Sequence, residues 1–106
     1  MIEIQVEFRD LNYSSFQVSG HAPGQKGNNV LCSAVSALSQ SLFFFLELKG
    51  RVKEKKIQEG FLYFSVFVEE VELVKNAFEQ ALCGLQNLEK QFPEEIQIYI
   101  KSYNTN

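Results

Sequence analysis

Hydrophobic and polar side chains alternate along residues 2–9, with isoleucine, valine and phenylalanine at the even positions and charged or amide groups between them. This period of two predicts a strand with one buried face. Residues 10–12 carry turn-forming side chains, and the alternation resumes at Phe16 and Val18. The chain is therefore expected to open with two strands joined by a tight turn.

Two longer segments place apolar residues three or four positions apart, which predicts helices over residues 30–48 and about 70–91. Gly50 ends the first helix and Pro93 ends the second. The apolar stripe of the first comprises Leu31, Val35, Leu38, Leu42 and Leu46. That of the second comprises Val71, Val74, Phe78, Ala81, Leu85, Leu88 and Phe92.

Three further strands complete the expected fold. Residues 51–59 form a charged strand, residues 61–68 form a buried strand after the turn at Gly60, and alternating isoleucines mark a last strand at residues 96–100. The order β-β-α-β-β-α-β predicts a two-layer α/β (α+β) fold, with a mostly antiparallel sheet and two helices on one face. Its length suits one domain over residues 1–106.

Composition narrows the class of protein. The chain is 45% hydrophobic and carries ten Phe and four Tyr, enough to bury a core. Its net charge of −3 argues against nucleic-acid binding by the domain as a whole. The first residues lack the features of a signal peptide, and the longest uninterrupted apolar run, residues 42–46, is too short to cross a bilayer. We therefore expect a cytoplasmic protein without a membrane partner.

The chain offers no metal or cofactor motif. One histidine and two distant cysteines cannot form a zinc site. The glycine-containing segment 20–29 lacks the Lys-Ser/Thr ending of a phosphate-binding loop. Cys83 lies off the apolar stripe of the second helix and has no nearby histidine, so we interpret it as structural. We expect neither a metal ion nor a cofactor.

The single histidine, His21, lies eleven residues before Cys32, across a loop that is rich in glycine and asparagine. Asn28 or Asn29 can cap the helix that follows. Cys32 then lies in the first helical turn, where the partial positive charge and unpaired N–H groups favour a thiolate and an oxyanion. Without further information, Cys32 remains equally well explained as a small packing residue, and His21 as a solvated loop residue.

The faces of the first helix separate Cys32 from the core. At about 100° per residue, Cys32, Ser36 and Ser39 share a face with Phe43 beside the apolar stripe. The only aspartate, Asp10, lies at the hairpin turn, roughly 20 Å from His21 at the length of one strand. It should not orient the histidine, which leaves a Cys-His dyad as the simplest catalytic arrangement.

The residues Gly20-His21-Ala22, followed by Cys32-Ser33-Ala34-Val35-Ser36 at a helix start, resemble the ribosomal-processing cysteine protease (Prp) family. The flanking strands and the closing helix and strand fit as well, so the resemblance covers nearly the whole chain. It implies a cytoplasmic endopeptidase, commonly a homodimer, that removes a short N-terminal extension from ribosomal large-subunit protein twenty-seven.

Carried over by motif, the resemblance implies Cys32 as the nucleophile and His21 as the general base. Gly20 would shape the approach to His21, Ser36 would lie one turn beyond the sulfur, and the loop 22–29 would move to admit the substrate peptide. Asn29 stands where many members of the family have an aspartate. If the family's aspartate is only a neighbouring anion, its replacement by Asn29 eases thiolate formation at Cys32. If that aspartate orients His21 or binds substrate, its replacement alters activity.

Two alternatives stay open. A basic run comprises Lys49, Arg51, Lys53, Lys55 and Lys56, and it most often marks a protected edge strand. It also allows a non-catalytic, ribosome-associated or RNA-binding assembly module. A family member that lost activity through the change at Asn29 is the other alternative.

Three consecutive phenylalanine rings, at residues 43–45, must point in different directions from one helix. At least one of them should therefore lie off the core face, which predicts a second contact surface.

Overall fold

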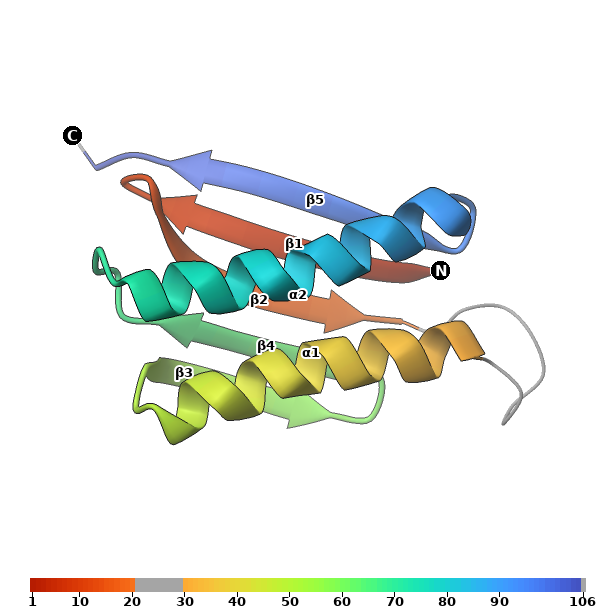
Figure 1. Ribbon diagram of the computed structural model, residues 1–106, viewed down its shortest axis with the longest axis horizontal. Helices are drawn as coiled ribbons and strands as arrows, with labels where there is room; N and C mark the ends of the chain where they lie inside the picture. The colour runs from red at the N-terminus through yellow and green to blue at the C-terminus, as the bar shows by residue number, and fades with distance from the viewer. Residues whose placement is uncertain (21–29, 106) are drawn as a thin grey trace.

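The structure, a computed structural model, describes residues 1–20 and 30–105. The elements follow the predicted order (Figure 1). They are β1 (Ile2–Arg9), β2 (Asn12–Ser19), α1 (Val30–Leu48), β3 (Val52–Gln58), β4 (Phe61–Val66), α2 (Glu72–Gln91) and β5 (Ile96–Tyr103).

The five strands form one sheet in the order β3-β4-β2-β1-β5. Three neighbouring pairs are antiparallel, as predicted. The pair β1 and β5 is parallel, from Ile2 opposite Ile96 to Arg9 opposite Tyr103. The sheet is therefore mixed, because α2 carries the chain from β4 across to the far edge beside β1 (Figure 1).

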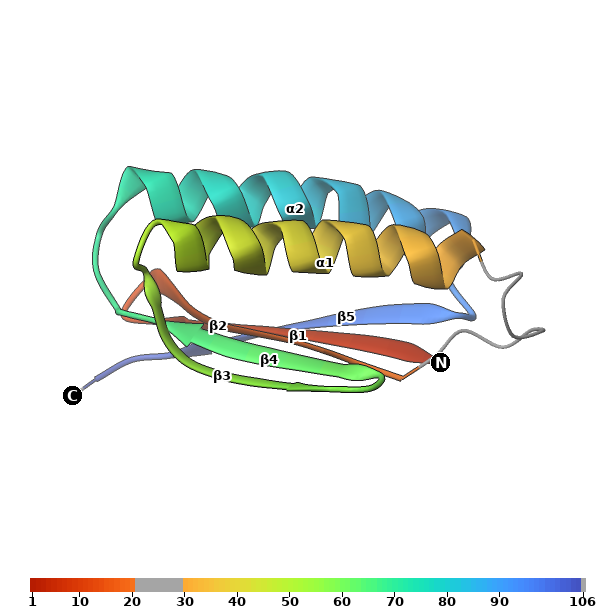
Figure 2. The same cartoon turned by 90° about the horizontal axis from the view of Figure 1, so that it is seen from below.

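Both helices lie on one face of the sheet, as predicted (Figure 2). The apolar, even-numbered residues of β1 turn toward them and are fully buried from Ile2 to Val6. Aromatic rings fill the space between the layers. Phe64 of β4 lies at its centre, with ring centroids 5.4 Å from Phe43, 5.6 Å from Phe16 and 6.0 Å from Phe78.

The three consecutive phenylalanines of α1 do not all face the core, as predicted. Phe43 is 2% exposed, whereas Phe44 and Phe45 are 59% and 40% exposed. By length and composition alone α1 is apolar enough to cross a membrane. Its buried residues, including Val35 and Leu46, belong instead to the same core cluster as the sheet. This is the packing of a core helix in a two-layer fold.

Helix α2 differs in detail from its predicted span. It begins at Glu72 rather than at residue 70, because Val71 has an extended backbone and occupies the N-cap position. It ends as expected before Pro93, where the N–H of Phe92 donates to the carbonyl of Leu88 at 2.9 Å. Leu82 is buried although it was not assigned to the apolar stripe. The apolar arc of α2 is therefore wider than a single row of residues.

Candidate active site

Cys32 lies in the first turn of α1, as predicted. In that turn the backbone N–H groups have no acceptor within the helix. The first turn contains no acidic residue that would offset its partial positive charge. Cys32 is half-buried and packs against the core cluster. Both it and Cys83 are thiols rather than parts of a disulfide. This position leaves part of the Cys32 side chain open to a substrate, and the first turn of α1 favours a negative charge on its sulfur.

Gly20 is held tightly at the end of β2. Its backbone has φ +91°, in the left-handed region, and its N–H donates to the carbonyl of Gly60 at 3.1 Å. A Cβ at this position would lie 2.2 Å from the carbonyl oxygen of Met1. Only glycine fits such a conformation against another backbone. The residue directly before His21 is therefore fixed by contacts with β1 and with the β3–β4 turn.

Gly20 and Cys32 line one cavity of about 300 Å³. Ser36, one turn after Cys32 and exposed, lines it as well. Three of the predicted site residues thus meet at one place, between the start of α1 and the β3–β4 hairpin. None of the described residues around this cavity is charged. Its walls are mainly apolar, with the thiol at one end.

His21, Asn29 and the predicted substrate loop 22–29 lie outside the described residues. Asp10 is described, and it lies at the β1–β2 turn, at the opposite end of the strands from Gly20. Its carboxylate accepts hydrogen bonds from the N–H and the hydroxyl of Thr105 at 2.6 and 2.7 Å. These bonds lower the pKa of Asp10. Asp10 therefore lies one strand length from Gly20, and its carboxylate already has hydrogen-bond partners.

Within residues 1–20 and 30–105, no three His, Cys, Asp or Glu side chains lie together so that they could hold a metal ion. Cys83 is exposed on α2, away from the cavity that Cys32 lines. It was interpreted as a structural residue, yet its exposure shows that it does not pack in the core.

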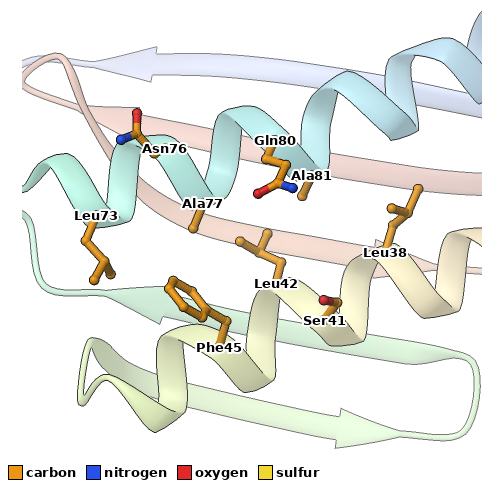
Figure 3. A pocket seen from close by; sticks show the side chains of 9 residues that line it. All are labelled: Leu38, Ser41, Leu42, Phe45, Leu73, Asn76, Ala77, Gln80 and Ala81. Atoms are coloured by element: carbon orange, nitrogen blue, oxygen red, sulfur yellow. The ribbon is translucent and has the colours of Figure 1, made fainter.

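A larger groove of about 480 Å³ separates the two helices (Figure 3). It shares no lining residue with the cavity beside Cys32. Side chains of α1 and α2 point into it from both sides, among them Phe45 and Leu73 (Figure 3). Its described lining contains no titratable or nucleophilic group other than the hydroxyl of Ser41. The described residues therefore give this groove no acid, base or thiol.

The basic run at β3 is largely engaged within the chain. Arg51 forms an ion pair with Glu69 at 3.3 Å, and Lys55 forms one with Glu47. The ammonium group of Lys49 lies 5.7 Å from the centre of an aromatic ring. Three of the five basic side chains therefore have a partner within the chain.

Comparison with known proteins shows the family and the fold. A family model described as the cysteine protease Prp matches residues 1–97. The matched segment contains Gly20, Cys32 and Ser36, together with the positions of His21 and Asn29. The comparison with curated proteins found no match.

Several solved structures share the fold. The essential ribosomal processing protease Prp from S. aureus, in complex with a covalently linked product peptide, superposes with a TM-score of 0.85 at 18% identity, covering 95% of this chain and 100% of that chain. The same protease with a substrate peptide gives 0.81 at 17% identity, with the same coverage. The protein SMU.848 from Streptococcus mutans gives 0.76 at 27% identity, covering 96% of this chain and 95% of that chain.

Proposed function

Because the chain belongs to the Prp family and is a cysteine protease, we propose that Cys32 is its nucleophile and that His21 is its general base. The observation that carries this proposal is the place of the Cys32 thiol, in the first turn of α1 and beside the cavity that Gly20 also lines. Gly20 immediately precedes His21 in the chain. The residue directly before the proposed base therefore lines the same cavity as the Cys32 thiol.

The reaction follows from these roles. His21 takes the proton of the Cys32 thiol, and the thiolate attacks the carbonyl carbon of the scissile bond. The N–H groups of the first turn of α1 stabilise the oxyanion of the tetrahedral intermediate. His21 then protonates the leaving amine as the C–N bond breaks. A water molecule, deprotonated by His21, hydrolyses the thioester, which releases the acyl product and restores the thiol.

We propose that the substrate is the N-terminal extension of a ribosomal protein, namely protein twenty-seven of the large subunit. The solved structure from S. aureus is described as a ribosomal processing protease and holds a covalently linked product peptide. An extended peptide would enter beside the loop 22–29 and place its scissile carbonyl at Cys32. Ser36, which is exposed beside the same cavity, and Asn29 would support binding of the peptide.

The direct test uses a synthetic peptide that contains the extension and the residues after it. Cys32→Ala and His21→Ala should each abolish its cleavage, while circular dichroism shows an unchanged fold. Cys83→Ala removes the other thiol and should retain full activity, so it is the matched control. Full activity of Cys32→Ala would end the proposal. Asn29→Asp, assayed beside the native chain, tests whether the departure at this position lowers activity.

The homodimer and the cytoplasmic location that the resemblance implies are also proposals. Phe44 is 59% exposed and Leu48 is 82% exposed on α1, so this helix carries apolar surface that a second copy would cover. Sedimentation velocity at several concentrations measures the assembly state, and Leu48→Glu should shift it toward the monomer. A monomer at all concentrations would contradict the dimer. Fractionation of cells that express the chain tests its location.

A further inference from the structure

Strand β3 forms one edge of the sheet, so part of its backbone has no neighbouring strand. Which part follows from the hydrogen bond that the N–H of Gly20 donates to the carbonyl of Gly60 at 3.1 Å. This bond shows that the backbone of Gly60 points toward β2. Because successive residues of a strand point their N–H and C=O groups to opposite sides, Phe61, Tyr63 and Ser65 of β4 point toward β3.

The register of the β3–β4 hairpin then identifies the open residues of β3. The partners of those three β4 residues are Gln58, Lys56 and Glu54, and their backbone groups point inward. The residues between them, Lys55 and Ile57, therefore point their N–H and C=O groups away from the sheet. Among the residues that the structure describes, none forms a hydrogen bond with these outward groups.

The opposite edge of the sheet, β5, is covered where it begins. The side chain of Glu89 on α2 accepts the N–H of Ile98 at 2.7 Å, and the N–H of Ile96 donates to the carbonyl of Phe92 at 3.2 Å. Proteins commonly cover edge strands, because open ones pair with other chains. β3 has no such cover among the described residues, up to the turn that closes its hairpin.

The open part of β3 leads directly to the cavity beside Cys32. Ile57 lines this cavity and is 58% exposed. Other exposed lining residues include Gln40 and Phe44 of α1, and α1 lies over the β3–β4 side of the sheet (Figure 1 and Figure 2). The mouth of the cavity thus lies between the flank of α1 and the free edge of β3. A chain segment paired with Lys55 and Ile57 passes this mouth.

The charge of β3 decides which extended chain fits its edge. Three of its seven residues are lysines, and Glu54 is its one acidic residue. In a symmetric pair of two copies, lysines of one β3 would face lysines of the other, and like charges opposite each other are destabilising. A substrate peptide meets no such repulsion unless it is itself basic there, and it gains main-chain hydrogen bonds whatever its side chains are. The edge therefore fits a peptide better than a second copy.

We propose that the extended substrate peptide is held as an added strand on the free edge of β3, by the backbone N–H and C=O groups of Lys55 and Ile57. The inference rests on the proposed function, because it assumes that the substrate carbonyl lies at Cys32. The hydrogen bonds lie away from the reacting carbonyl, so they form equally in the bound substrate and in the transition state. Such uniform binding lowers KM and leaves kcat unchanged.

Proline substitution tests the pairing, because proline removes one N–H and is tolerated at an edge where that N–H points to solvent. Lys55→Ala and Lys55→Pro both lose the ion pair with Glu47, but only the proline variant loses the N–H. The KM for the synthetic substrate peptide should be about five- to tenfold higher in Lys55→Pro than in Lys55→Ala, the effect of one neutral hydrogen bond, at equal kcat. Equal KM values would overturn the proposal.

Ile100→Pro on β5 is the matched control for a proline in an edge strand. Ile100 lies two residues after Ile98, so its N–H also points away from the sheet, and the residue is 50% exposed. This variant should keep the native KM. A rise in KM equal to that in Lys55→Pro would overturn the proposal, because any edge proline would then have the same effect.

Amide hydrogen exchange measures the pairing without a substitution in β3. The Cys32→Ala chain is saturated with the same peptide, and exchange at Lys55 and Ile57 should slow, while exchange at Ile100 stays unchanged. Cleavage by the native chain without slower exchange at Lys55 would overturn the added strand and leave the proposed reaction standing. Slower exchange at Lys55 and Ile57 without cleavage by the native chain would count against the reaction and support the added strand.

Discussion

Replacing Gly20 with alanine should disturb the approach to the active site more than the same change at Gly50, which also has a positive φ. Gly20 has φ +91°, and its added Cβ would lie 2.2 Å from the carbonyl oxygen of Met1, where ordinary contact begins at 3.4 Å. The two backbones must therefore separate by 1.2 Å, which also pulls the N–H of Gly20 away from the carbonyl of Gly60.

The magnitude follows from two costs. A left-handed backbone costs an alanine about 1–2 kcal/mol, and loss of the hydrogen bond to Gly60 adds about 1 kcal/mol. The total, roughly 2–3 kcal/mol, should lower the melting temperature by about 10–20 °C in a domain of this size. Because Gly20 precedes His21, we also expect peptide cleavage to fall beyond the loss of folded protein.

Gly50 supplies a matched control. It also has a left-handed backbone, with φ +70°, but a Cβ there meets nothing within 4 Å. Gly50→Ala should therefore show only the backbone cost of about 1–2 kcal/mol and should retain cleavage. Urea unfolding of both variants measures the free energy of unfolding. An equal loss for Gly20→Ala and Gly50→Ala would refute the reasoning, because the contact with Met1 would then have no energetic effect.

Three further predictions concern the core, the helix pair and the chain end. Phe78→Ala empties a fully buried site and should cost about 3–5 kcal/mol in urea unfolding. Gly84→Ala brings a Cβ to 3.0 Å from the side chain of Leu38, which can shift. The gain of up to about 1 kcal/mol in helix propensity opposes the cost of this close contact, so the free energy of unfolding should stay within about 1 kcal/mol of the native value in urea unfolding. A larger loss would mean that Leu38 cannot move. The pKa of Asp10 in the folded protein lies below its usual value, so Asp10 stabilises the fold above its usual pKa, and this stabilisation is lost as the pH falls through the folded pKa. Amide exchange at Thr105 should therefore rise over that pH range in the native chain. In Asp10→Asn, exchange at Thr105 should not depend on pH after correction for intrinsic exchange.

Local periodicity was sufficient to predict all seven elements and the leucine and valine residues that α1 buries, but its buried face also includes Ser39 and Phe43, which were expected beside it. Phe43 and Phe44 point in different directions because successive side chains along a helix are rotated by about 100°, and this difference does not depend on tertiary contacts. The same geometry placed Cys32, Ser36 and Ser39 together on one face of α1. The comparison with the structure confirms that all three line one cavity.

Local periodicity could not predict contacts between distant parts of the chain. The parallel pairing of β5 with β1 depends on where α2 delivers the chain, and alternation along β5 is the same for either direction. The contact between Gly20 and the backbone of Met1 joins positions nineteen residues apart in the sequence. Ser39 was expected on a small, polar face, yet it is 1% exposed.

The central claim is that Cys32 is the residue which attacks the substrate. A peptide with an electrophilic chloromethyl ketone in place of the scissile bond would be captured by the attacking thiol, and mass spectrometry of the digested protein would locate the adduct. The account predicts a single adduct on Cys32, formed much more slowly in His21→Ala, with Cys83 unmodified. An adduct on Cys83, or equal slow labelling of both cysteines, would contradict it.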